Sequence, residues 1–172
     1  MHTNLNAAAA WALSTADAMA AGYARAGLAE REVAALVLIS SHAGVGVDWL
    51  YSRLGLTQSG TVRLVDRLAA AGLVARGTPG GRRGIPLTLT ATGRERLEEA
   101  LAGRAGALAT ATAALRPDEQ ELLAGLLAKA LAGRPRDRAE ADVACRLCDW
   151  PGCPRPCPVD ASVPGAGPAR SR

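Results

Sequence analysis

Residues 47–89 read VDWLYSRLGLTQSGTVRLVDRLAAAGLVARGTPGGRRGIPLTL, and this stretch decides the fold. We expect a short helix over 45–54 to end at Gly55, because glycine readily adopts the positive φ of a tight helix-ending turn. Thr57 then offers a side-chain N-cap for a second helix over 58–71. Two helices joined by a glycine turn are typical of a helix-turn-helix.

The residues after the second helix predict a β-hairpin. Gly72 closes that helix, and the segments 73–76 and 85–89 alternate apolar and polar residues as strands do. The turn between them, 77–84, is rich in glycine and arginine. Thr90 is placed to cap another helix over 91–115. The order helix, turn, helix, strand, basic hairpin, strand, helix is that of a winged helix-turn-helix.

The composition and the flanking segments favour a mostly α protein, with long terminal helices around the winged lobe. Aromatic residues make up 3% of the chain and phenylalanine is absent, so leucine, valine and alanine must build the core. We expect dimerisation helices in 1–44 and 91–133, the DNA-binding lobe in 45–90, and a cysteine-rich, partly disordered tail in 134–172. Within these, helices are predicted over 7–26, 28–41 and 119–132, with Asp118 as the N-cap of the last and disorder after Val159. The terminal helices carry apolar stripes that would not stay exposed, which indicates a homodimer.

The second helix is expected to present polar side chains to double-stranded DNA. Its N-terminal half leads into the major groove, where glutamine can pair with adenine and arginine with guanine. The predicted outward residues are Thr57 at the cap, then Gln58, Ser59, Thr61 and Arg63 toward the bases and Arg67 toward the backbone, with Val62, Val65, Leu68 and Ala69 in the core. Arg82 and Arg83 lie at the hairpin tip, within reach of the backbone or minor groove.

The charge distribution agrees with a DNA-binding lobe. The net charge is only +4, but between Arg53 and Arg96 the basic residues far outnumber the acidic ones. The arginines of this stretch are Arg53, Arg63, Arg67, Arg76, Arg82, Arg83, Arg94 and Arg96, and its acidic residues are Asp66 and Glu95.

The tail contains all four cysteines of the chain. Cys145, Cys148, Cys153 and Cys157 are spaced Cys-x2-Cys-x4-Cys-x3-Cys, and Pro158 follows. Four thiolates in so short a segment can surround one tetrahedral zinc ion, which we favour. An iron–sulfur cluster is an alternative, because Cys-x3-Cys-Pro recurs in cluster-binding loops, and free redox-active thiols are another.

Other functions have less support in the sequence. The only histidines are His2 and His42, and no nucleophile-base arrangement or phosphate-binding loop is present, so we expect no enzyme. No apolar run is long enough to span a bilayer, and the first residues do not resemble a signal peptide, so we expect a cytoplasmic protein. Four aromatic or imidazole side chains could line an effector cleft, although core packing is the commoner role for such residues: Trp11, His42, Trp49 and Tyr51.

Several stretches resemble the MarR family, across about residues 28–131. They are Val47-Asp48-Trp49-Leu50, Leu54 to Val62, Arg67-Leu68, Ala71 to Val74, Gly81-Arg82-Arg83 and Leu87 to Gly93. The resemblance implies interlocked terminal helices in a homodimer, a cleft for a small effector, and binding to a palindromic site, usually in repression. It also shows one departure, since Gly80-Gly81 stand where the family commonly has an acidic residue before the wing arginines. The alternative function is an iron–sulfur redox-sensing protein in which the helical domain is mainly a scaffold.

Overall fold

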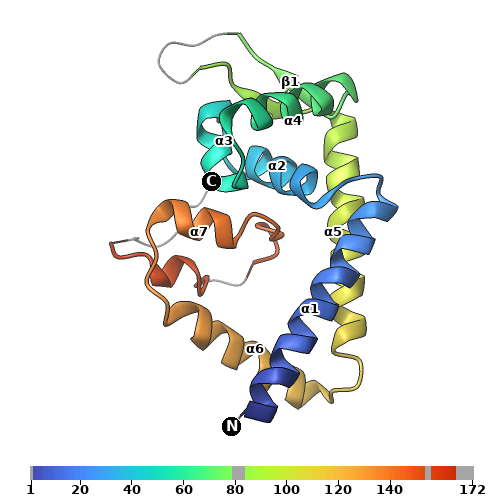
Figure 1. Ribbon diagram of the computed structural model, residues 1–172, viewed down its shortest axis with the longest axis vertical. Coiled ribbons are helices and arrows are strands. Elements are labelled where there is room, and N and C mark those ends of the chain that lie inside the picture. The colour runs from blue at the N-terminus through green and yellow to red at the C-terminus, as the bar shows by residue number, and fades with distance from the viewer. Residues whose placement is uncertain (1, 79–83, 154–155, 166–172) are drawn as a thin grey trace.

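The computed structural model describes residues 2–78, 84–153 and 156–165. In these residues it has the mostly α architecture with a small hairpin that the sequence predicts (Figure 1). The elements are α1 (His2–Arg25), α2 (Glu30–Ser41), α3 (Val47–Leu54), α4 (Gln58–Ala70), β1 (Val74–Arg76), β2 (Leu87–Leu89), α5 (Ala91–Ala111), α6 (Pro117–Ala132), α7 (Arg138–Ala144) and the 3-10 helix η2 (Asp160–Ser162).

Helix α2 forms the centre of the core. All seven residues from Val33 to Ile39 are buried, so the helix is covered on every side rather than along one stripe. It contacts α1, α3, α5 and β2. The expected boundary at residue 44 therefore runs through a continuous core, because α2 packs on the winged lobe as well as on the long helices.

Helices α1 and α5 lie side by side along the length of the molecule (Figure 1). Their backbones approach each other closely at Gly22 and Gly103. A Cβ atom added to Gly22 would lie 2.8 Å from the carbonyl carbon of Gly103. Two glycines facing each other thus allow a helix crossing that any side chain at either position would obstruct.

The winged helix-turn-helix forms as predicted. Gly55 ends α3 with a φ of 60°, and its N–H donates to the carbonyl of Tyr51. The strands pair antiparallel, with Val74 opposite Leu89 and Arg76 opposite Leu87. The Leu87 N–H also donates to the carbonyl of Val45 at 2.9 Å, which ties the hairpin to the segment before α3.

Helix α6 differs from its prediction at its start and has no buried residue. Pro117 is its first residue rather than part of the turn, and Arg116, not Asp118, is the N-cap. Proline suits the first helical position because its missing N–H would be unpaired there in any case. The exposed large apolar residues of α1 and α6 are Leu5, Leu13, Leu122, Leu126, Leu127 and Leu131.

The chain after α6 folds back beside α3 (Figure 1). Asp137 caps α7, accepting a hydrogen bond from the Glu140 N–H at 2.8 Å. The expectation of disorder after Val159 is wrong for η2: Ser162 is buried and accepts from Arg136, whose guanidinium also donates to the carbonyl of Leu131. Arg136, in the segment between α6 and α7, therefore holds this part of the tail in place. The composition of the tail did not reveal this contact. No helix in the described part of the chain is long and apolar enough to cross a membrane.

Candidate DNA interface and cysteine cluster

The start of α4 is a capped helix end with polar side chains facing outward. Thr57 accepts a hydrogen bond from the Gly60 N–H at 3.1 Å, which confirms the predicted N-cap. Gln58, Ser59 and Arg63 are exposed. Gln58 donates to the Asp48 carboxylate at 2.7 Å, so this side chain also braces α4 against α3.

The predicted direction of two neighbouring residues in α4 is wrong. Thr61 was expected to face DNA, but it is fully buried and its hydroxyl donates to the Thr57 carbonyl at 3.1 Å. Val62 was expected in the core, but it is 38% exposed. The buried face consists instead of Thr61, Leu64, Val65 and Leu68, which places Val62 beside Arg63 on the outward face. A threonine can occupy a core position because its hydroxyl is satisfied within the helix.

The arginines of the lobe differ in how tightly they are paired. The Arg67 side chain is 64% exposed and forms only a long ion pair with Glu32, with 3.9 Å between its Nε and the carboxylate, so its guanidinium can still reach a phosphate. Arg76 instead pairs with Asp66 at 2.5 Å, which joins β1 to α4. The predicted wing residues Arg82 and Arg83, with Gly80 and Gly81 before them, lie outside the described residues.

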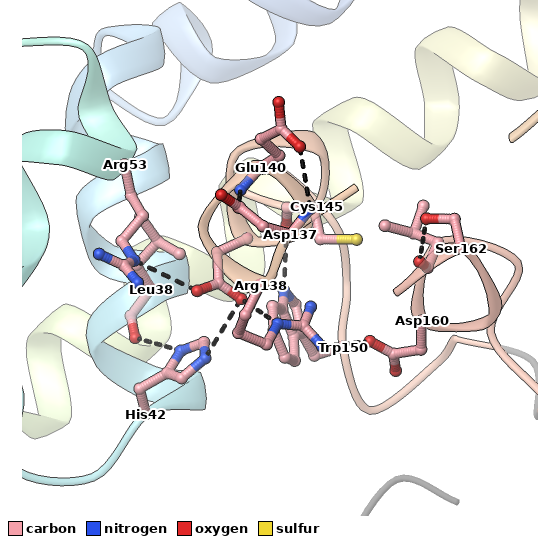
Figure 2. A network of polar contacts seen from close by, with 12 residues as sticks. Leu38, His42, Arg53, Asp137, Arg138, Glu140, Cys145, Trp150, Asp160 and Ser162 are labelled. Atoms are coloured by element: carbon pink, nitrogen blue, oxygen red, sulfur yellow. Dashed lines mark hydrogen bonds and ion pairs between the residues drawn. The ribbon is translucent and has the colours of Figure 1, made fainter. Parts of the chain in front are cut away.

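A buried carboxylate joins the C-terminal segment to the lobe. Asp142 of α7 is 1% exposed. Its carboxylate accepts from Arg53 of α3 at 3.2 Å and from Arg138 of its own helix at 3.1 Å, and His42 Nε2 lies 3.9 Å away. Figure 2 shows Arg53, His42 and Arg138 converging on this point. Sequence reasoning missed this cluster, because nothing marks Asp142 as the partner of a residue 89 positions earlier.

Aromatic contacts extend the cluster. The His42 ring lies 4.6 Å from Trp49 and 4.9 Å from Trp150, centroid to centroid, and the Arg53 guanidinium lies 4.2 Å from the Trp49 ring centroid. Burial lowers the pKa of His42, although the Asp142 carboxylate opposes this shift. The rings of His42 and Trp49 therefore take part in the contact between α3 and the C-terminal segment, through Trp150 and Arg53.

A separate open hollow lies between the starts of α2 and α4. Its volume is about 520 Å³. The residues that line it are Ala29, Glu30, Arg31, Glu32, Leu56, Gly60, Leu64 and Arg67. This hollow adjoins the candidate DNA-binding helix directly, through Gly60, Leu64 and Arg67.

The four thiols lie in the segment that follows α7 as two pairs, Cys145 with Cys148 and Cys153 with Cys157. Cys145 is buried together with Ala141 and Val159, and Cys148, Cys157 and Trp150 pack against these residues. The hydrogen bond from the Cys145 thiol, helped by the charge of Arg104, lowers the pKa of Cys148 to about 6. The same hydrogen bond raises the pKa of Cys145, and burial raises that of Cys153 to about 11.

This donor set suits a thiophilic metal ion in composition and proximity. Cys148 and Cys157 both pack against the small cluster that contains Cys145, so three of the four thiols share one neighbourhood. As they stand, however, no three His, Cys, Asp or Glu side chains in the described ranges surround a common point that could hold an ion.

The fold defines a winged helix-turn-helix protein. Its relatives agree: residues 26–84 match the model of the MarR family, and the chain has the fold of MarR-family regulators. Members of this family are DNA-binding regulators and not enzymes. The sequence resemblance to the MarR family is thus confirmed.

Three solved structures illustrate the likeness. The YusO protein of Bacillus subtilis is 26% identical, with a TM-score of 0.67 over 77% of this chain and 95% of that one. The MarR family protein Rv2887 of Mycobacterium tuberculosis, solved with p-aminosalicylic acid, is 26% identical, with a TM-score of 0.59 over 72% of this chain and 95% of that one. Its complex with DNA aligns at 24% identity, with a TM-score of 0.61 over 72% and 93% of the two chains, and supports the fold. No curated protein matches the chain.

Proposed function

We propose that this chain is a transcriptional repressor that binds a palindromic operator in double-stranded DNA as a homodimer, in the cytoplasm. The observation that carries the proposal is the start of α4. It is a capped helix, braced by α3, that presents Gln58, Ser59 and Arg63 to solvent next to a basic hairpin. A helix end of this kind enters the major groove in helix-turn-helix proteins.

The outward residues divide by the chemistry they offer. Arg63 suits a bidentate contact with guanine and Gln58 a contact with adenine. The exposed Val62 offers an apolar surface to a thymine methyl group, a role that replaces the one first assigned to Thr61. The exposed Arg67 suits a phosphate. We assign Arg82 and Arg83 of the wing to the backbone or minor groove.

The homodimer is supported by the exposed leucines of α1 and α6. A protomer with Leu13 at 68% and Leu122 at 63% exposure leaves large apolar side chains in water. A second copy would cover them, and a two-fold axis would place two α4 helices about one DNA turn apart. That symmetry is the reason to expect a palindromic operator.

The experiment is a DNA-binding titration at several salt concentrations, using an operator selected from random-sequence DNA. A regulator that neutralises several phosphates loses affinity steeply as salt rises and prefers its operator over competitor DNA. A protein whose helical domain is only a scaffold shows neither behaviour, and that result would refute the proposal.

We also propose that the four cysteines bind metal, zinc in preference to an iron–sulfur cluster. The purely thiol donor set and the shared neighbourhood of three of the four thiols support this. Metal and sulfide analysis of protein purified without oxygen decides between the ligands. A colourless protein with about one zinc per chain supports zinc, and a protein that contains iron and sulfide carries an iron–sulfur cluster. A protein with no bound metal has free redox-active thiols. Cys148→Ser should lose the metal, whichever it is.

A small-molecule effector is a further part of the proposal. The lining of the hollow between α2 and α4 includes Arg31 and Arg67, which could contact a carboxylate, together with Glu30 and Glu32, so a ligand there would meet charges of both signs. A relative of similar fold was solved with p-aminosalicylic acid. Release of operator DNA by salicylate, and loss of that response in Arg31→Ala, would support a ligand of this class in this hollow.

A further inference from the structure

We propose that α7 and η2 form a brace between α6 and α3, which fixes the angle of the winged lobe and so the separation of the two α4 helices in the dimer. The positioning residues of this brace are Arg53, Arg136, Arg138 and Asp142. The proposal rests on the dimer and the DNA binding proposed above. It is independent of the cysteines, because other side chains make every contact that it uses.

The brace meets the lobe at a buried carboxylate. Asp142 of α7 is 1% exposed, and a carboxylate so deeply buried is costly unless it is paired and hydrogen-bonded. Arg53 of α3 donates to one of its oxygens at 3.2 Å, and His42 at the end of α2 lies 3.9 Å from the other. Arg53 also donates to the Trp49 carbonyl at 3.3 Å, so the carboxylate is held against the α3 backbone.

Arg138 carries the connection from α7 to η2. Its Nε donates to the second oxygen of Asp142 at 3.1 Å, and its Nη1 donates to the carboxylate of Asp160 at 2.7 Å (Figure 2). The planar guanidinium suits two carboxylates at once, because its donors point in fixed directions. Since Arg53 and Arg138 hold opposite oxygens of Asp142, charge-assisted hydrogen bonds run without interruption from α3 to η2.

The other end of the brace is fastened to the end of α6. Arg136 is 9% exposed, and its guanidinium donates to the Leu131 carbonyl of α6 at 2.6 Å and to the Ser162 hydroxyl of η2 at 3.0 Å. The Arg136 N–H also donates to the Ser162 carbonyl at 3.0 Å. Separating α6 from η2 would therefore leave a buried positive charge without its partners, which is costly.

These contacts close a ring of elements around the molecule. Helix α5 leads from the hairpin to the turn before α6, where the Gln120 amide donates to the carbonyls of Thr112 and Leu115, both at 3.1 Å. In Figure 1, α7 and η2 lie between α3 and α6 and complete the third side. A lobe joined to α6 only through α5 can swing at one corner, whereas a closed triangle keeps its angles. The lobe is thus held ready for one separation of operator half-sites, which reduces the ordering cost of binding.

The test measures how strictly the dimer requires one distance between half-sites. The probes are the operator selected from random-sequence DNA, the same operator with one base pair inserted between its half-sites, and a single half-site. The inserted base pair moves one half-site by about 3.4 Å and turns it by about 35°.

The variants of the full-length protein are Arg53→Gln at the lobe and Arg138→Gln in the middle of the brace. The matched control is Arg96→Gln, which removes the same charge and breaks an exposed pair with Glu99. The Arg96 and Arg138 side chains are 47% and 46% exposed. Because Arg138 is this exposed, its variant keeps the test decisive if Arg53→Gln fails to fold.

In wild type and Arg96→Gln, the inserted base pair should weaken binding by about tenfold or more, because a rigid dimer no longer engages both half-sites at once. In Arg53→Gln and Arg138→Gln it should weaken binding by less than about threefold, with a half-site affinity equal to that of Arg96→Gln. Equal insertion effects in all four proteins overturn the brace and leave the proposed function intact. Brace variants that lose half-site affinity also overturn it, because the contacts then only stabilise α3 and α4 locally.

Amide hydrogen exchange without DNA tests the brace independently of operator binding. If α7 and η2 act as one body, Arg53→Gln should speed exchange at the far end, in 161–163, by at least about threefold. Arg138→Gln should likewise speed exchange in 47–54 of α3, which Arg138 does not contact through its hydrogen bonds. Faster exchange confined to the neighbours of each altered residue overturns the brace. If wild type binds no operator, the proposed function fails, and this exchange measurement still decides the brace.

Discussion

Replacing Leu122 and Leu126 with alanine tests the proposed use of α6 as a dimer interface. The two side chains are 63% and 57% exposed in the protomer. Burial of a whole leucine side chain is worth about 1.5–3 kcal/mol, so covering these exposed portions is worth about 1–1.5 kcal/mol each. A symmetric dimer contains two copies of each residue, which brings the total to about 4–6 kcal/mol if the interface covers them fully.

At about 1.4 kcal/mol per factor of ten, this loss raises the dissociation constant of the dimer by roughly a thousandfold or more. Sedimentation equilibrium over a range of protein concentrations measures it directly. Glu121→Ala, an exposed substitution on the same helix, is the control and should leave the constant unchanged. A double leucine variant that dimerises as tightly as wild type, with an unchanged circular dichroism spectrum, would refute the assignment of α6 to the interface.

Three further changes test the account in the protomer. Thr57→Ala removes the cap of α4 and should lower the free energy of unfolding by about 1 kcal/mol in a urea titration, whereas Thr57→Ser should retain most of it; equal stability of all three proteins would contradict the capping contact. Gly103→Ala places a methyl group against the Gly22 backbone and should lower the free energy of unfolding by about 1–3 kcal/mol. The control is Gly106→Ala, whose methyl group would meet nothing within 4 Å and should not lower it. Similar urea midpoints for the two variants would argue against the close crossing. Burial lowers the pKa of His42 below its usual 6.5, so the unfolded chain binds more protons than the folded protein, and the contribution of His42 to stability should fall as the pH drops below about 6.5. In His42→Gln this part of the pH dependence of the free energy of unfolding should disappear. An unchanged pH profile would show that His42 is not its source.

The order of elements could be predicted from the sequence because local signals agree with the tertiary fold. Gly55 and Thr57 mark the turn between α3 and α4, and Thr90 caps α5 by accepting from the Gly93 N–H at 2.9 Å. These are short-range contacts, and the residue types that make them are few. The same holds for β2, in which Leu87 and Leu89 are buried and Thr88 is exposed, whereas in β1 only Val74 is buried and no alternation is seen.

The side-chain directions within α4 were less predictable. Thr61 and Val62 are adjacent β-branched residues of similar size, so periodicity alone assigned the valine to the core and the threonine to solvent. The structure reverses them, since Thr61 satisfies its hydroxyl on the Thr57 carbonyl. Long-range pairing was beyond sequence reasoning altogether. The Arg53–Asp142 contact spans 89 residues, and in the sequence Arg53 is only one of several basic residues of the DNA-binding lobe.

The central claim is that α4 reads DNA, and the most direct measurement is the ratio of operator to competitor affinity in Arg63→Ala and Arg67→Ala. Loss of a base-reading arginine should lower that ratio about tenfold or more, because a bidentate guanine contact is worth about 1–3 kcal/mol. Loss of a phosphate-binding arginine should weaken both affinities alike and leave the ratio within about threefold of wild type. If Arg63→Ala keeps the wild-type ratio and affinity, the exposed face of α4 does not read the operator and the account is wrong.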